Sequence, residues 1–151
     1  MDARLLCLHD ARHAWSRLRG WRALPRDGGL HGVWLRPCCA VHTWGLREPL
    51  DLCFLDRCDQ PLRFCLGVPV GTWRWCPQAY SVLEAPAGLL CGPEGFGPWR
   101  DALRQLRQGG GRVWVSLGEA DDRLGQRRRT EPVIGPDQTV GLGVESPNTL
   151  R

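Results

Sequence analysis

Short apolar segments separated by glycine- and proline-rich turns run through most of this chain, and they constrain its fold more than any other feature. The segment LDLCFL at 50–55 alternates, with Leu50, Leu52 and Phe54 on one face and Asp51 on the other. Its second face also carries apolar residues, so both faces should be covered. Several such strands predict a mainly β fold, a compact antiparallel sandwich or barrel-like single domain with one or two short helices.

The expected elements follow from this spacing. A short helix is expected after Asp10, and a second over 98–108, where Pro98 stands at the first position of an apolar i, i+3, i+4, i+7 stripe. The 151 residues suffice for one domain with a core, which we place at 1–118, and the polar residues 119–151 read as a disordered tail. Strands are expected over 4–10, 30–44, 50–55, 62–66, 73–76, 79–84 and 112–117.

The charge pattern excludes several classes of function. Every basic residue is arginine, and a chain without lysine cannot use a lysine Schiff base or a P-loop lysine. The tail from 119 onward carries six acidic residues against five arginines, which argues against a nucleic-acid-binding arm. The apolar run Leu5–Leu8 is too short for a signal peptide, and no run could span a membrane, so a cytoplasmic location is expected.

Eight cysteines raise the question of metal or disulfide chemistry. None lies in a CxxC motif, and none pairs with histidine at zinc-finger spacing. Without a secretory signal, structural disulfides are not expected. Cysteines within apolar runs, such as Cys7 and Cys53, read as small buried hydrophobic residues, and the sequence predicts no cofactor.

The densest group of polar residues lies in the segment 32–56, which reads as a hairpin around a GLREP turn. A carboxylate at Asp51, inside an apolar strand, must be paired or hydrogen-bonded, and Arg47 is the nearest partner in sequence. One interpretation is a pocket lined by His42, Thr43, Arg47 and Asp51, with Trp44 as an aromatic wall, for a small anionic or sugar-like ligand. The other is structural: Asp51 holds backbone amides of the turn.

Three blocks of the chain together resemble a known family. RLRGW at 17–21, GVWLRPCCAVHTWGLREPLDLCFLDR at 32–57 and WRWCPQAYSVLEAPAG at 73–88 are similar to the RLRGL, LRPC-SVHTFGMR-PIDVVFLD and VLELPAG segments of a bacterial and archaeal family. This family is known as domain of unknown function 192, and the similarity covers roughly 15–88. This chain departs from the family's pattern at Leu46, Glu48 and Ala85, and its sequence beyond Gly88 differs from that of the family.

The resemblance implies a compact, mostly β sandwich or barrel-like fold, in agreement with the strand pattern. Some family members are exported, some lie near pilus or secretion genes, and none contributes an established activity. Relatives can also carry cysteine at the positions of Cys38 and Cys76, which makes this pair a weak alternative for a metal or redox role.

Together these observations favour a non-enzymatic ligand-binding or accessory protein, whose partner is a small ligand or another protein. The motifs GxSxG, HExxH, GxGxxG and the Walker loop are absent from the sequence. The alternative is a hydrolase or thiol-dependent enzyme that uses His42 with Cys38 or Asp51. A protein-interaction role for exposed aromatic residues and the helix over 98–108 is a third possibility.

Overall fold

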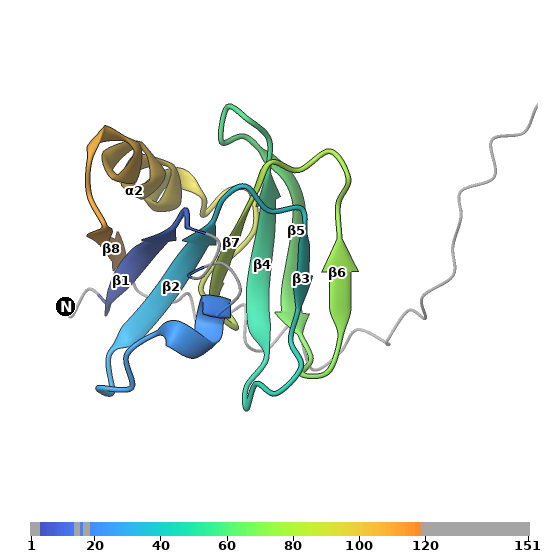
Figure 1. Ribbon diagram of the computed structural model, residues 1–151. Helices are drawn as coiled ribbons and strands as arrows, with labels where there is room; N and C mark the ends of the chain where they lie inside the picture. Colours follow the sequence, from blue (N-terminus) through green and yellow to red (C-terminus); the bar gives the residue numbers. More distant parts are fainter. Residues whose placement is uncertain (1–3, 14–15, 17–18, 119–151) are drawn as a thin grey trace, which may run out of the picture. The chain divides into compact units, whose positions relative to one another are not determined.

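The computed structural model describes residues 4–13, 16 and 19–118, whose strands form two sheets (Figure 1). Six strands form an open sheet in the order β5-β4-β7-β2-β1-β8, and β3 pairs with β6 in a second sheet. The predicted mainly β fold class is confirmed. In chain order the elements are β1 (Arg4–Ala11), the 3₁₀ helix η1 (Gly20–Ala23), β2 (Leu30–Leu35), β3 (Ala40–His42), β4 (Leu50–Leu55), β5 (Pro61–Val68), β6 (Trp73–Trp75), β7 (Ser81–Pro86), α2 (Gly97–Gln108) and β8 (Arg112–Leu117).

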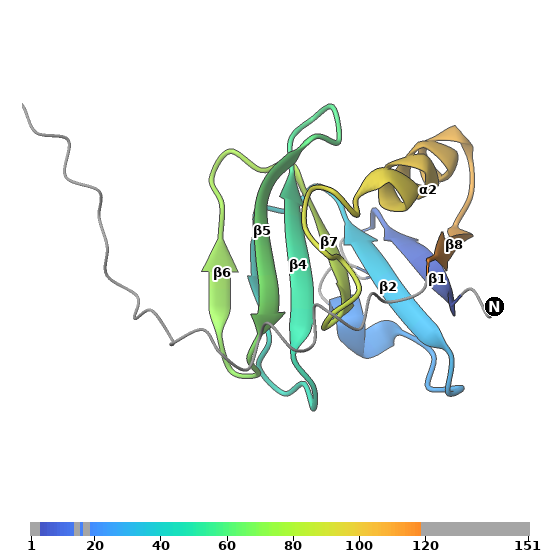
Figure 2. The same cartoon turned by 180° about the vertical axis from the view of Figure 1, so that it is seen from behind.

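The six-stranded sheet separates two apolar clusters. On one face, α2 packs its buried stripe of Trp99, Ala102, Leu103 and Leu106 against the sheet, as its spacing predicted. Figure 2 shows α2 beside β8 and β1, at the end of the sheet away from β5. On the other face, Val41 of β3 and Trp21 of η1 cover the second cluster. The apolar face of α2 is therefore part of the core and not a free surface.

The central strand β4 follows its predicted alternation. Leu50, Leu52 and Phe54 belong to the cluster under β3, whereas Cys53 and Leu55 belong to the cluster under α2. All six residues of β4 are buried, because β5 and β7 flank the strand and both of its faces are covered. This strand fixes the position of Asp51 in the interior.

The predicted hairpin over 32–56 is wrong. The strand expected over 30–44 divides at Pro37, which has no backbone N–H for a sheet ladder. The first part, β2, stays in the large sheet, and the second part, β3, leaves it to pair with β6. Strand β7 lies between β2 and β4, so the segment around Gly45–Pro49 connects two different sheets.

One strand pair is parallel. β1 and β2 run side by side in the same direction, with Cys7 in register with His31 and Leu8 in register with Gly32. The connection between them passes through η1, which thereby lies over the sheet. In the segment after Asp10 where a helix is expected, Ala11 belongs to β1, and residues 14, 15, 17 and 18 lie outside the described part of the chain.

Replacing Gly32 by alanine is expected to lower the free energy of unfolding by about 1–2 kcal/mol. A Cβ atom there would lie 3.0 Å from the backbone oxygen of Glu84 and 3.2 Å from a methyl carbon of Leu6. Urea unfolding followed by circular dichroism measures the effect. At Gly97, which has open space around it, the same substitution should cost nothing measurable. Equal effects at the two sites would contradict the close packing at Gly32.

Among the described residues, no helix has the length and apolar character needed to cross a membrane. The residues 119–151, for which a disordered tail is expected, lie outside the described part, and that expectation stays a prediction.

Candidate functional site

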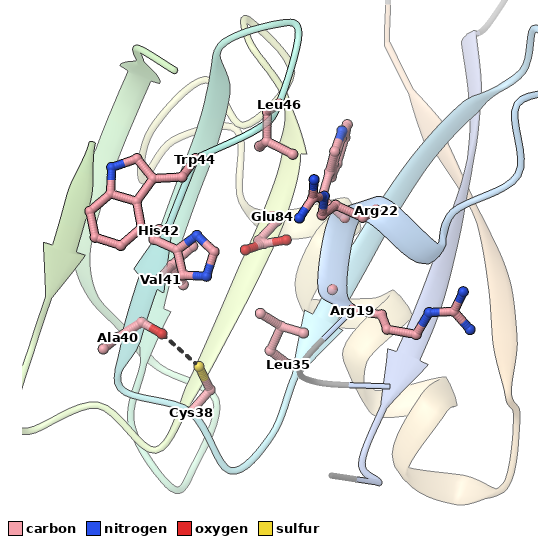
Figure 3. A pocket seen from close by; sticks show the side chains of 12 residues that line it. Arg19, Arg22, Leu35, Cys38, Ala40, Val41, His42, Trp44, Leu46 and Glu84 are labelled. Carbon is pink, nitrogen blue, oxygen red and sulfur yellow. Dashed lines mark hydrogen bonds between the residues drawn. The ribbon is translucent and has the colours of Figure 1, made fainter. Parts of the chain in front are cut away.

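A pocket of about 90 Å³ opens between η1 and the segment that contains β3. Figure 3 shows Glu84 of β7 in the middle of its lining, with His42 and Trp44 on one side and Arg22 on the other. Leu35, at the end of β2, closes the pocket toward the sheet. The pocket therefore combines an acidic group, an arginine and aromatic rings from three separate segments.

The floor of the pocket is the carboxyl group of Glu84, which is only 3 % exposed. Within the described residues, its Oε2 atom has no hydrogen-bond partner. Burial raises the pKa of Glu84 to about 8, and a hydrogen bond from the backbone amide of Trp21 opposes this rise only in part. At neutral pH the group therefore mostly carries its proton, and it can both donate and accept a hydrogen bond.

The two arginines of the lining differ in orientation. Arg22 extends from η1 over the pocket, and its guanidinium lies so close to Gly45 that a Cβ atom there would meet Nη2 at 2.8 Å. Gly45 has a φ of 74°, so both its conformation and this contact favour glycine. The guanidinium of Arg19 points away from Glu84 (Figure 3). Arg22 is thus the cation that a bound molecule would meet.

A row of aromatic rings borders the pocket. The ring of His42 stacks on Trp44, with centroids 5.1 Å apart and an interplanar angle of 25°, and Trp73 of β6 lies 6.2 Å further on. The indole Nε1 of Trp44 donates a hydrogen bond to the backbone oxygen of Gly71 at 2.9 Å, which holds the ring in place. Trp44 is 53 % exposed, so much of its indole surface is open to solvent beside the pocket.

Of the five residues predicted from the sequence, the structure places His42 and Trp44 in the pocket lining. Thr43, which stands between them in the sequence, is buried and does not line the pocket. Its hydroxyl donates to the backbone oxygen of Pro69 at 2.7 Å and accepts a hydrogen bond from the amide of Thr72, so it anchors the segment that precedes β6. Arg47 is exposed and does not line the pocket.

Asp51 lies apart from this lining, and it is fully buried. Its Oδ1 accepts a hydrogen bond from the amide of Gly67 at 2.7 Å, and its Oδ2 accepts from the amides of Gly88 at 2.7 Å and Leu90 at 3.2 Å. The structural interpretation was therefore right about backbone amides but wrong about their location, since none belongs to the GLREP turn. The predicted pairing with Arg47 is not among these contacts.

The contacts of Cys38 and Asp51 do not favour the alternative of an enzyme that uses either residue with His42. The carboxylate of Asp51 is occupied by three amides, and the thiol of Cys38 donates to the backbone oxygen of Ala40 at 3.1 Å. In the described part of the chain no hydrogen bond joins His42 to Asp51. The Cys76 thiol contacts the side-chain oxygen of Gln78 at 3.8 Å.

The sequence reasoning missed Glu84 and Arg22 as site residues. A signal for Glu84 was present, because it stands between Leu83 and Ala85 in an apolar strand, just as Asp51 stands between two leucines. Arg22 gave no such signal, since it is one of many arginines and its position depends on how η1 crosses the sheet.

No family model matches this chain, and no curated protein matches it. Two solved structures match part of it at low similarity. One is a protein of unknown function from Novosphingobium aromaticivorans, with 15 % identity and a TM-score of 0.44 over 71 % of this chain and 72 % of that one. The other is a "putative transcription regulator" from Sinorhizobium meliloti, with 14 % identity and a TM-score of 0.44 over 72 % of this chain and 80 % of that one. At this level of similarity neither informs the activity of this chain, and the resemblance to domain of unknown function 192 stays a prediction.

Proposed function

We propose that this domain is a non-enzymatic binding module, and that its pocket holds a small anion that also bears hydroxyl groups, such as an acidic sugar. The observation that carries the proposal is the buried Glu84 carboxyl at the floor of an open pocket, with Oε2 unpartnered within the described residues. A buried polar atom without a partner costs free energy, and a ligand hydroxyl or carboxylate would supply that partner.

The surroundings of Glu84 favour this ligand class. Arg22 brings a positive charge to the pocket mouth, which suits a carboxylate. The protonated Glu84 can donate to the same anion without charge repulsion, or bind a hydroxyl group. The face of Trp44 beside the pocket suits the apolar face of a sugar ring.

A binding role is favoured over hydrolysis by the composition of the pocket. Glu84 is the one carboxyl group among the described lining residues, so a paired-carboxylate mechanism lacks its second member there. The ring of His42 is stacked on Trp44, and its position next to the pocket suits contact with a ligand.

Titration with glucuronate, followed by two-dimensional NMR of the full chain, is expected to shift the side-chain signals of Trp44 and Arg22. Glucose offers only the hydroxyl groups and acetate only the carboxylate, so each should bind more weakly than glucuronate.

Replacing Trp44 by alanine should weaken glucuronate binding about tenfold or more, because the stacking face is lost. Trp75→Ala is the matched control, since Trp75 of β6 is similarly exposed but does not line the pocket. Equal losses in both variants, or no shift at Arg22 with any of the three compounds, would contradict the proposal.

A further inference from the structure

We propose that Cys7, His9 and His31 form a binding site for a divalent transition metal ion, with zinc as the best chemical fit. Cys7 and His9 lie two residues apart on β1 and therefore face the same side of the sheet. His31 is the register partner of Cys7 on the parallel neighbour β2. One potential ligand atom from each of the three side chains lies within 4.8 Å of the other two.

The spacing of the two imidazole rings already approaches that of a metal site. The Nε2 atom of His9 and the Nδ1 atom of His31 are 3.1 Å apart. Two nitrogen ligands of a tetrahedral zinc ion would be about 3.3 Å apart, and a sulfur and a nitrogen ligand about 3.6 Å. Insertion of an ion therefore requires displacements of a few tenths of an ångström at the imidazoles and a modest side-chain movement at Cys7.

Asp27 prepares His31 for this role. Its Oδ1 atom lies 2.7 Å from Nε2 of His31 and also accepts a hydrogen bond from the backbone amide of Gly29 at 2.9 Å. A carboxylate can only accept, so Nε2 carries the proton, and in the neutral ring Nδ1 offers its lone pair toward His9. A carboxylate hydrogen-bonded to the distal nitrogen of a histidine ligand is a recurrent feature of zinc sites, where it fixes the ring and raises its basicity.

The charges around the three side chains are compatible with a bound cation. Desolvation and the proximity of His31 lower the pKa of His9, which keeps that ring in the neutral form that ligates metals. Burial raises the pKa of Cys7, Arg112 on β8 opposes this rise in part, and Asp27 adds to it. Metal binding would release the thiol proton of Cys7, and His9 would ligate through Nε2 with its own proton on Nδ1. The thiolate and the carboxylate of Asp27 together balance the two positive charges of the ion.

The donor set selects the kind of metal. One thiolate and two imidazoles are borderline-soft ligands that suit zinc and its neighbours, whereas calcium and magnesium prefer oxygen ligands. Three protein ligands leave the fourth tetrahedral position to water. His9 is half-buried, in contrast to its two partners, and gives an ion a path from solvent.

Titration of the reduced full-length chain with Co²⁺ is the direct test, because cobalt reports its ligands by absorbance. One equivalent is expected to produce the visible bands of tetrahedral cobalt together with a thiolate-to-metal charge-transfer band in the near ultraviolet, and Zn²⁺ should displace both. His9→Gln and His31→Gln should weaken binding at least tenfold, and Cys7→Ser should abolish the charge-transfer band. Asp27→Asn should weaken binding about tenfold through the orientation of His31.

The controls separate this site from adventitious binding by other thiols. Cys58→Ser and Cys91→Ser remove the two exposed thiols among the described residues, and both variants should retain the full signal. Circular dichroism verifies the fold of each variant. Should the buried Cys7→Ser variant not fold, the half-buried His9→Gln variant decides the test. An unchanged Co²⁺ affinity in His9→Gln, or a charge-transfer band that disappears in the Cys58 or Cys91 variant, would overturn the proposal.

Discussion

Replacing Asp51 by alanine is expected to lower the free energy of unfolding by about 3–5 kcal/mol. The substitution removes the acceptor of three backbone amides, those of Gly67, Gly88 and Leu90, at a site without solvent exposure. Asp51→Asn should also be destabilising, because its amide group would direct N–H donors toward backbone N–H groups. Urea unfolding of the three proteins, monitored by circular dichroism, measures these differences.

Asp56 supplies the matched control for this experiment. Its Oδ1 atom also accepts backbone amides, those of Cys58 and Gln60, at 2.8 and 2.9 Å, but it does so in a turn at the surface. There water can replace the lost acceptor, so Asp56→Ala should cost only about 1 kcal/mol. A cost at Asp51 no larger than at Asp56 would mean that water reaches the three amides, and the interior role of Asp51 would be refuted.

The second large effect is a loss of stability as the pH rises from about 5 to 8. In the unfolded chain Glu84 ionises near its ordinary pKa of 4.5, whereas in the folded chain its pKa is about 8. Between these values the folded state holds a proton that the unfolded state has released, so raising the pH favours unfolding. Below 4.5 both states are protonated and the contribution of Glu84 is complete. The slope should approach at most about 1.4 kcal/mol per pH unit.

Glu84→Gln isolates this contribution, because glutamine keeps the shape of the side chain and does not titrate. The difference in unfolding free energy between the two proteins, measured in urea at several pH values, should change through this window and level off above pH 8. Titration of His9 and other groups is common to both proteins and cancels in the difference. Parallel pH profiles would show that Glu84 is ionised and solvated in the folded state.

Structural features that depend only on residues close together in the sequence could be predicted from the sequence. The alternation in β4 and the apolar stripe of α2 are local periodicities, and the structure confirms both. The pairing of the strands could not be predicted in this way, because β7, which lies far from β2 in the sequence, pairs between β2 and β4 in the sheet. The hairpin prediction is wrong for this reason, since segments that are adjacent in the sequence are not adjacent in the sheet.

The candidate sites also divide into features set by local sequence and features set by contacts between distant segments. The sequence could indicate that a carboxylate at Asp51 needs partners, but those partners lie 16, 37 and 39 residues further along the chain. The group of Cys7, His9 and His31 depends on the parallel pairing of β1 with β2, which no local pattern reveals. Glu84, by contrast, could have been identified from its apolar neighbours alone.

The pairing of β1 with β8 has a consequence for how the chain acquires its structure. Leu6 is in register with Val115, and Arg4 with Leu117, so β1 completes the ladder on this edge only when β8 pairs with it. During synthesis, one edge of β1 stays unpaired until residue 117 has left the ribosome. Such an unpaired strand edge can pair with another chain. Contacts between such distant segments also slow folding. Nascent chains that stop before β8 should therefore be the species most dependent on chaperones.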